Sequence, residues 1–358
     1  MFLEKNQERI ANFVRVSQAA GARADYVQGG GGNTSVKLAD GLMAIKASGF
    51  CLSDITADNA YAVLDGAAIR DFYLSNERSQ LADVEAAGSA RAKESIQIIE
   101  GLPQLRPSVE AGFHSILKTY VVHTHSVYAN LAACSTACRQ IAEVAFASAD
   151  YSWGWVDYTD PGANLTFAIR DELRRVKKET GKVPAVILMQ NHGIIVHDDD
   201  PDSCLAIHTD ANERLAKLFG LTGNSFPEVT MQKMAGTFYA ATTPYLKAAL
   251  KNCSWTETML MEQPLYPDQM VFLADTFYMD KDEIADGTCV ASTETGELLL
   301  NMPEKKARTL VETLTAVFFI MAHIKAAGYT LSTMGEAAKK FIANWESEKY
   351  RKSLAAKK

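Results

Sequence analysis

The chain has 358 residues, of which 47% are hydrophobic and 22% charged, and its formal net charge is −7. This is the composition of an ordinary globular protein, and the length allows one large or two medium domains. Lys and Arg (36) are fewer than Asp and Glu (43), so no surplus of positive charge is available to neutralise phosphates, which argues against nucleic acid as a partner. No run approaches the roughly 18 apolar residues that a membrane span requires, so we expect no membrane partner.

The first residues, MFLEKNQERIANFVRVSQ, are charged and amphipathic and lack the apolar segment of a signal peptide. The six cysteines are scattered along the chain, which is typical of free thiols in a reducing compartment. We therefore expect a cytoplasmic protein.

Helical and extended patterns alternate along residues 1–224. The predicted elements, in chain order, are a helix over 4–20, a glycine loop at 29–32 that leads into an extended segment, a strand over 43–50, a mostly helical region over 54–100, a helix over 108–119, a strand over 120–123, a helix over 126–136, one buried strand over 184–197 that is closed by a turn at 191–193, and a helix over about 201–220. This alternation indicates an α/β or α+β sheet domain covered by helices.

A composition shift at 222–236 (LTGNSFPEVTMQKM) predicts a domain boundary, which we place between 224 and 225. Residues 225–358 would form an α+β extension. Its predicted elements are a possible strand over 270–279, short strands over 287–293 and 297–302, and helices over about 303–327 and 332–351.

Two histidines, His123 and His125, form an H-x-H pair on a predicted strand. Alternate side chains of a strand share a face, so the two imidazoles can bind one metal ion or can be half-buried on a sheet surface. His192 follows a strongly apolar strand, where it either caps the turn or faces a site. Glu110 begins the helix before the H-x-H strand, where its carboxylate also favours the helix dipole.

Three neutral imidazoles and one carboxylate are a ligand set that zinc accepts readily, and other divalent metals can use it too. A cupin also has an H-x-H pair, but its glutamate follows that pair closely in an all-β chain. Here residues 126–130 are Ser-Val-Tyr-Ala-Asn in a helix-rich region, which excludes the cupin interpretation. His114, four residues after Glu110, is expected to pack beside the ligands without being one.

The glycine loop, Gly29 to Gly32 followed by Asn33, matches neither a P-loop nor a dinucleotide-binding fingerprint. It is either a tight turn or a nest of backbone N–H groups that binds an anion together with the Asn33 amide. Ser48, Gly49 and Ser108 would supply further donors.

Five motifs together resemble the class II aldolase/adducin family, the group of fuculose-phosphate and rhamnulose-phosphate aldolases. They are GGNTSVK (31–37), KASG (46–49), PSVE (107–110), HTH (123–125) and NHG (191–193), in the family's order over about residues 5–220. The sequence GGGNTSVK and the helical stretch before PSVE are most similar to the longer bacterial rhamnulose-phosphate aldolase type domains.

The resemblance implies a central sheet, mainly antiparallel or mixed, with helices on both faces. It implies an aldolase that cleaves a ketose phosphate or related sugar acid through an enediolate stabilised by Zn²⁺ or another divalent metal. Metal ligands would be Glu110, His123, His125 and His192, and Glu110 would also be the catalytic base. The substrate phosphate would lie on loop positions Gly32, Asn33, Ser48, Gly49 and Ser108. A homo-oligomer, by resemblance a tetramer, is expected.

One departure from the family pattern bears on the substrate. Fuculose-type members have two serines before the glutamate, whereas this chain has Ser108 and then Val109, so one hydroxyl donor is missing. A second acid or base would come from a tyrosine or carboxylate, for which Tyr151 is the candidate. The alternatives are a sugar-phosphate 4-epimerase or dehydratase on the same scaffold, or a non-catalytic adducin-like binding module.

Overall fold

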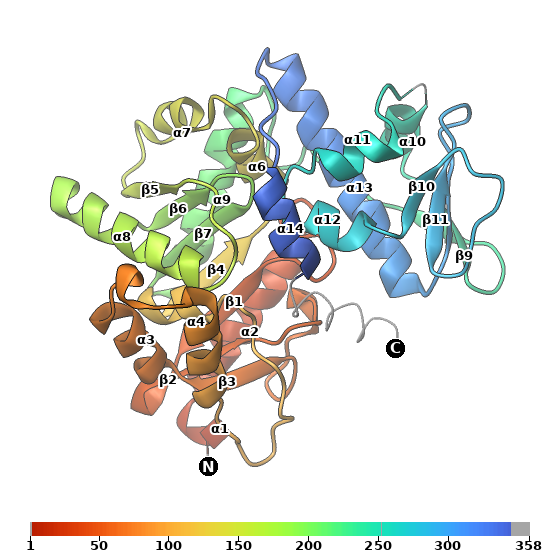
Figure 1. Ribbon diagram of the computed structural model, residues 1–358. Coiled ribbons are helices and arrows are strands. Elements are labelled where there is room, and N and C mark those ends of the chain that lie inside the picture. The colour runs from red at the N-terminus through yellow and green to blue at the C-terminus, as the bar shows by residue number, and fades with distance from the viewer. Residues whose placement is uncertain (1, 252, 345–358) are drawn as a thin grey trace.

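A computed structural model describes residues 2–251 and 253–344, which form two sheets joined by helices (Figure 1). The seven-stranded sheet has the order β3-β2-β1-β4-β7-β6-β5. Its strands are β1 (Asn33–Lys37), β2 (Leu42–Lys46), β3 (Tyr61–Asp65), β4 (Tyr120–Thr124), β5 (Trp153–Val156), β6 (Val186–Met189) and β7 (Gly193–Asp198). All neighbours pair antiparallel except β5 and β6, which are parallel. The predicted mixed, mainly antiparallel sheet is confirmed.

Helices cover both faces of this sheet, as predicted. One face packs against α2 (Gln7–Gly21), α6 (Val127–Ala133), α7 (Cys138–Phe146) and α9 (Pro201–Leu218). The other face packs against α3 (Gly66–Ser75), α4 (Val84–Glu94), α5 (Ala111–Ile116) and α8 (Ala163–Thr180). The short helix α1 (Phe2–Lys5) precedes α2, and the 3₁₀ turns are η1 (Ala39–Gly41), η2 (Leu52–Asp54) and η3 (Arg78–Gln80).

The alternation of side chains along β4 decides where the first histidine lies. Val122 packs in the core under α2 and α9, whereas Val121 packs in the core under α5 and α8. His123 therefore shares the second face with Val121. There its ring meets Phe113 of α5, with the ring centroids 5.7 Å apart.

The later part of the chain contains a five-stranded sheet of order β10-β11-β12-β9-β8, which matches the predicted α+β character. Its strands are β8 (Met231–Lys233), β9 (Phe238–Ala241), β10 (Phe277–Met279), β11 (Thr288–Ala291) and β12 (Leu298–Asn301). Its helices are α10 (Pro244–Leu250), α11 (Glu257–Glu262), α12 (Pro267–Leu273), α13 (Glu304–Ala326) and α14 (Glu336–Asn344).

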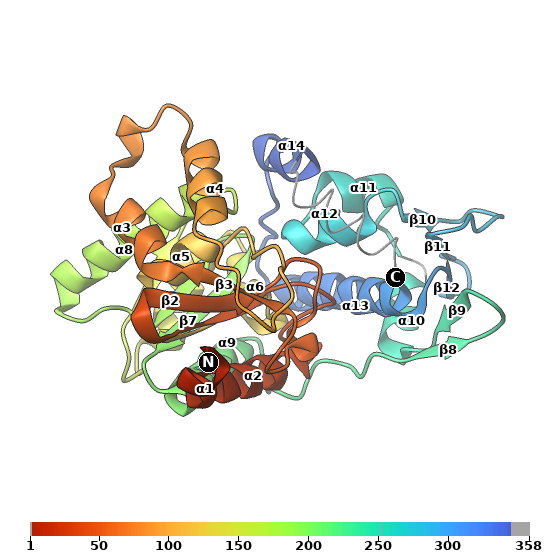
Figure 2. The same cartoon turned by 90° about the horizontal axis from the view of Figure 1, so that it is seen from below.

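The long helix α13 joins the two parts, as the view from below shows (Figure 2). It shares one core with α6 of the first part and with β9, β11 and β12 of the second. By length and composition α13 alone among the described helices could cross a membrane, but 67% of its most apolar window is buried inside the protein. Its apolar sequence is therefore explained by this core. The connection from α9 to β8 contains the predicted boundary at 224/225.

Two predicted elements are wrong, and a third is wrong in part. The region 54–100 contains the strand β3, which pairs along its full length with β2. Residues 184–197 form the two strands β6 and β7, because the chain reverses at 190–192 and β7 pairs back antiparallel. The predicted strand over 270–279 starts within helix α12, which begins at Pro267, and only its end at 277–279 is a strand, β10. A proline at the first helical position is favourable, and a short apolar run does not by itself distinguish helix from strand.

Candidate metal centre

Three histidines reach one site from two neighbouring strands of the first sheet. His123 is on β4, His125 follows that strand directly, and His192 lies in the turn between β6 and β7. Gly193 allows the turn between β6 and β7 to lie against the end of β4, because a Cβ atom at this position would lie 2.3 Å from the carbonyl oxygen of Thr124. The glycine after His192 therefore lets the turn approach β4 closely enough for the three rings to meet.

The ring nitrogens of these histidines face one another. One ligand atom from each of the three lies within 4.8 Å of the others. The Nε2 atoms of His123 and His125 are 3.2 Å apart. The carboxylate of Glu110 closes the group, with Oε2 3.4 Å from His123 Nε2 and Oε1 3.4 Å from His192 Nε2. The fold thus brings together the four side chains that the sequence analysis selected as ligands.

Hydrogen bonds at the far side of two rings leave their Nε2 atoms as the ligand atoms. His123 Nδ1 donates to the carbonyl oxygen of Ile194 at 3.0 Å. His125 Nδ1 donates to Oδ2 of Asp268 at 2.5 Å. An imidazole that carries its proton on Nδ1 has a lone pair on Nε2, and such outer bonds fix both the tautomer and the ring orientation of metal-binding histidines.

Burial keeps the rings of His123 and His192 neutral. Desolvation lowers the pKa of His123 to about 4, although the nearby Glu110 carboxylate opposes this shift. The pKa of His192 lies well below the ordinary value, again because of desolvation, with the neighbouring histidines adding to the effect. Both imidazoles are therefore unprotonated at neutral pH, which is the form that binds a metal ion.

The Glu110 carboxylate is held by Asn33 of β1, which is itself held by His114 of α5. The Asn33 amide donates to Glu110 Oε2 at 2.6 Å and to the Ser108 hydroxyl oxygen at 3.1 Å. The amide oxygen of Asn33 is bonded to Nε2 of His114, whose Nδ1 lies 2.7 Å from the Ser35 hydroxyl. His114 thus orients Asn33 and does not join the ligand group, as expected from the sequence.

The group fits a divalent cation on chemical grounds. Within residues 2–251 and 253–344, the buried atom Glu110 Oε1 has no hydrogen-bond partner, and neither has His192 Nδ1. A buried acceptor without a partner costs roughly 1–3 kcal/mol, and a cation beside Oε1 would remove that cost. Three imidazole nitrogens and a carboxylate oxygen are also a common zinc ligand set. The residues present are therefore compatible with the metal that the sequence implied.

The predicted anion-binding loops lie around this centre. A hollow beside the histidines is lined by Gly32, Asn33, Ser48 and Ser108, together with Lys46 of β2. Gly49 does not line it, although its neighbour Ser48 does. The Ser108 hydroxyl accepts bonds from Asn33 and from the Glu110 backbone.

Tyr151, the candidate second acid or base, lies apart from this group. It precedes β5, and β5 runs parallel to β6 with Trp153 opposite Val186. His192 follows the other end of β6, so the sheet separates Tyr151 from the histidines along a full strand. The Tyr151 hydroxyl donates to Asp210 Oδ2 of α9 at 2.8 Å. The fold of one chain does not bring Tyr151 to the candidate centre.

The later part of the chain supplies a site residue that the sequence analysis missed. Asp268, on α12, lies against His125, and Pro267, Asp268 and Val271 form one wall of the hollow. The segment LYPDQMVFL carried no signal for this role, because an acidic residue after a proline is also what the first turn of any helix favours.

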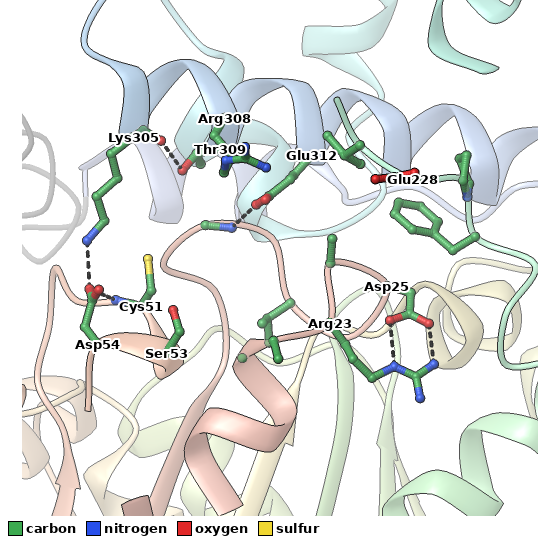
Figure 3. A pocket seen from close by; sticks show the side chains of 18 of the residues that line it. Arg23, Asp25, Cys51, Ser53, Asp54, Glu228, Lys305, Arg308, Thr309 and Glu312 are labelled. Carbon is green, nitrogen blue, oxygen red and sulfur yellow. Dashed lines mark hydrogen bonds and ion pairs between the residues drawn. The ribbon is translucent and has the colours of Figure 1, made fainter. Parts of the chain in front are cut away.

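The helix α13 holds the outer side of the glycine loop (Figure 3). The backbone N–H of Gly29 donates to Glu312 Oε2 at 2.9 Å, and Lys305 Nζ lies 2.7 Å from Asp54 Oδ2. A cavity of about 610 Å³ separates the loop from α13 around these contacts. The glycine loop therefore has the candidate metal centre on one side and the later part of the chain on the other.

Together, the sheet and these side chains define an α/β protein with a buried candidate centre for a divalent metal. The family model for the Class II Aldolase and Adducin N-terminal domain matches residues 11–219, more than half of the chain. The chain therefore belongs to this family, which confirms the resemblance predicted from the five motifs. No curated protein matches the sequence.

Several solved structures are similar to part of the chain. The N-terminal class II aldolase domain of a protein from Thermoplasma acidophilum has 21% identity and a TM-score of 0.47, covering 58% of this chain and 92% of its own. A putative aldolase/epimerase/decarboxylase from Klebsiella pneumoniae has 18% identity and a TM-score of 0.41, covering 62% and 92%. A sugar-phosphate aldolase from Thermotoga maritima has 14% identity and a TM-score of 0.40, covering 60% and 96%.

Proposed function

We propose that this protein is a divalent-metal-dependent carbon–carbon lyase that cleaves a ketose phosphate or a related sugar acid. The observation that carries the proposal is the convergence of His123, His125 and His192 with the Glu110 carboxylate in one buried group. Family membership supports enzymatic lyase chemistry, and the ligand set favours Zn²⁺.

A cation bound by these residues would act as a Lewis acid towards the negative charge that develops on substrate oxygens when a bond beside a carbonyl breaks. Residues of this chain would transfer the proton and position the group that transfers it. Glu110 is the group that moves a proton at the substrate carbon, because its carboxylate is the only one among the described residues that contacts both His123 and His192. Asn33 holds that carboxylate by the bond to Oε2.

The loops beside the metal group are suited to an anionic substrate. Ser48, Ser108 and Asn33 line the hollow, and Lys46 is buried in the same wall. The Ser48 hydroxyl donates to the Pro107 carbonyl and the Asn33 amide to Glu110 and Ser108, so a substrate anion would take over hydrogen bonds that these donors now make within the protein. Lys46 Nζ donates to the carbonyl oxygens of Gly30 and Phe50 and thereby fixes the glycine loop. These donors support a phosphate or carboxylate group on the substrate.

The hollow beside the histidines is too small for a sugar phosphate, so substrate binding would require its walls to move apart. The hollow measures about 40 Å³, whereas pockets for small organic ligands typically measure roughly 300–1,000 Å³. One wall is α12 and another is the loop at Val109, so a movement of either would enlarge the hollow.

The test is a metal analysis followed by a substrate panel. We expect about one divalent ion per chain, and aldehyde release from at least one ketose 1-phosphate or sugar acid in a coupled assay. Unphosphorylated sugars serve as the matched controls for the phosphate. A protein that holds no divalent metal and cannot be reconstituted would instead be an adducin-like binding module.

A second candidate function is epimerisation or dehydration on the same scaffold, since both need the same metal group and base. The missing hydroxyl at Val109, where a fuculose-type member has a serine, favours keeping these alternatives. Product analysis of the same panel separates them, because an epimerase returns an isomer and a dehydratase releases water without cleaving the carbon chain.

Tyr151 remains a prediction as the second acid or base. Since one chain does not bring it to the centre, this role requires a neighbouring subunit of the expected homo-oligomer. If Tyr151→Phe keeps full turnover in the oligomer, the assignment is wrong.

A further inference from the structure

Asp268 is the described carboxylate that lies against the histidine group from outside the first sheet. It is on α12, 143 residues after His125 in the sequence, and its Oδ2 accepts the proton of His125 Nδ1 at 2.5 Å. Both side chains are buried, with 7% of His125 and 1% of Asp268 exposed. A carboxylate in this position holds the imidazole with its Nε2 lone pair towards the other rings.

The glycine loop leaves room for this pair. A Cβ atom on Gly31 would lie 2.2 Å from Asp268 Oδ2 and 3.2 Å from His125 Nδ1. Gly31 is not among the glycines with positive φ, so its backbone does not itself require glycine. The absence of a side chain at this position is therefore explained by the space that the Asp268–His125 contact occupies.

Further contacts place the segment around Asp268 against the same turn and loop. The Asn191 side-chain amide, next to His192, donates to the carbonyl oxygens of Leu265 and Ser332, each at 2.8 Å. The Tyr266 hydroxyl donates to Gln28 Oε1 at 3.2 Å. The segment is thus fixed to both sides of the histidine group, which gives the Asp268 carboxylate a defined position.

We propose that Asp268 is a positioning residue of the metal centre, which orients His125 for a divalent cation, so that the centre is completed by the C-terminal part of the chain. This inference rests on the metal-dependent function proposed above. It gives residues 225–358 a role in the site in addition to shaping the fold. A purely structural role for Asp268, in the first turn of α12, is the competing explanation.

The test compares Zn²⁺ affinity, measured by chelator competition on the metal-free full chain, for the wild type, Asp268→Asn and the exposed control Asp282→Asn. Loss of an outer carboxylate typically weakens metal binding by about 10- to 100-fold, so we expect that decrease for Asp268→Asn and none for Asp282→Asn. Thermal unfolding of the metal-free proteins is measured in parallel. A structural role would lower the unfolding temperature while leaving the affinity of the folded protein unchanged.

A double-mutant cycle assigns the effect to His125. In a His125→Ala background, Asp268→Asn should cause no further loss of affinity, because the ring that it orients is gone. Gly31→Ala should weaken Zn²⁺ binding in the same direction as Asp268→Asn, and it provides a second variant if Asp268→Asn does not fold. The absorption spectrum of the Co²⁺-substituted protein should change in both variants, since it reports ligand geometry.

The two proposals fail in different ways. If the wild type binds no divalent metal, the proposed function fails. If the wild type binds Zn²⁺ and both Asp268→Asn and Gly31→Ala bind it equally tightly, the metal-dependent function stands and Asp268 has no positioning role.

Discussion

The parts of the chain before and after residue 224 contribute to the candidate centre in different ways. The first part supplies every candidate ligand, and these side chains occur in short local motifs such as H-x-H and N-H-G. The second part supplies a wall and the Asp268 carboxylate through contacts between residues more than a hundred positions apart. Local motifs therefore reveal which atoms can bind a metal, whereas tertiary contacts decide how those atoms are held.

Removing a candidate ligand should have the largest effect. In His123→Ala and His192→Ala we expect the loss of stoichiometric metal and of all metal-dependent turnover, because each change removes one of three nitrogens that meet within 4.8 Å. Metal content after gel filtration is the measurement. The control is His323→Ala on α13, since its Nδ1 bonds to the Phe319 carbonyl away from the centre. Full metal content in His192→Ala would contradict the ligand set.

Removing the base should affect turnover without removing the metal. General base catalysis typically contributes about 10²- to 10⁴-fold, so Glu110→Gln should lower kcat by that order. Gln keeps the size of the side chain and an oxygen acceptor for the Asn33 amide. Steady-state kinetics together with metal content make the measurement, with the exposed Glu143→Gln as control. A fully active Glu110→Gln enzyme would show that another group moves the proton.

Acid should destabilise the metal-free protein through histidines that are buried outside the ligand set. Burial lowers the pKa of His197 and of His208 to about 3. A histidine in the unfolded chain titrates near 6.5. Below that pH the unfolded chain binds protons that the folded chain does not bind, so the free energy of unfolding falls. Between pH 7 and 5 each histidine should cost on the order of 2 kcal/mol.

Urea unfolding with chelator present, at pH 7 and at pH 5, measures this loss. His208→Asn should reduce the difference between the two pH values, whatever it does to stability at pH 7. An unfolding free energy that stays constant between these pH values would mean that the buried histidines are already protonated or reached by water.

The smallest expected effects concern the contacts between α13 and the glycine loop. Glu312→Ala removes the acceptor of the Gly29 N–H and should cost about 1 kcal/mol of unfolding free energy. Glu312→Gln keeps an acceptor and is the matched control. Lys305→Ala breaks an exposed ion pair with Asp54, for which we expect less than about 1 kcal/mol. A Lys305→Ala loss larger than that of Glu312→Ala would reverse this order.

The contrast between local motifs and tertiary contacts also explains which elements of the fold could be predicted from the sequence. The mixed sheet with helices on both faces follows from alternating patterns and from motifs whose spacing is local. The strand β3 and the helix α12 were missed, because short apolar runs have the same composition in either conformation. The β6–β7 hairpin was predicted as one strand closed by a turn, because nothing in its apolar sequence shows that the chain pairs back on itself after that turn. Pairing partners, such as β2 for β3, decide between them.

The residues of the candidate centre also fall into those that local motifs predict and those that only tertiary contacts reveal. Glu110, His123, His125 and His192 were predicted, because their chemistry and spacing were visible in the sequence. Asp268 was not, since a single aspartate gives no sign of a partner 143 residues away. Tyr151 was selected from its approximate position in the chain, and the parallel pairing of β5 with β6 places it at the other end of the sheet.

The most direct test of the convergence of these four side chains is a crystal structure of the purified protein with data collected across the zinc absorption edge. We expect one anomalous peak, bonded to Nε2 of His123, His125 and His192 at about 2.0–2.1 Å. A crystal grown with excess Zn²⁺ that shows no peak among these three rings would contradict the metal centre and the lyase function built on it.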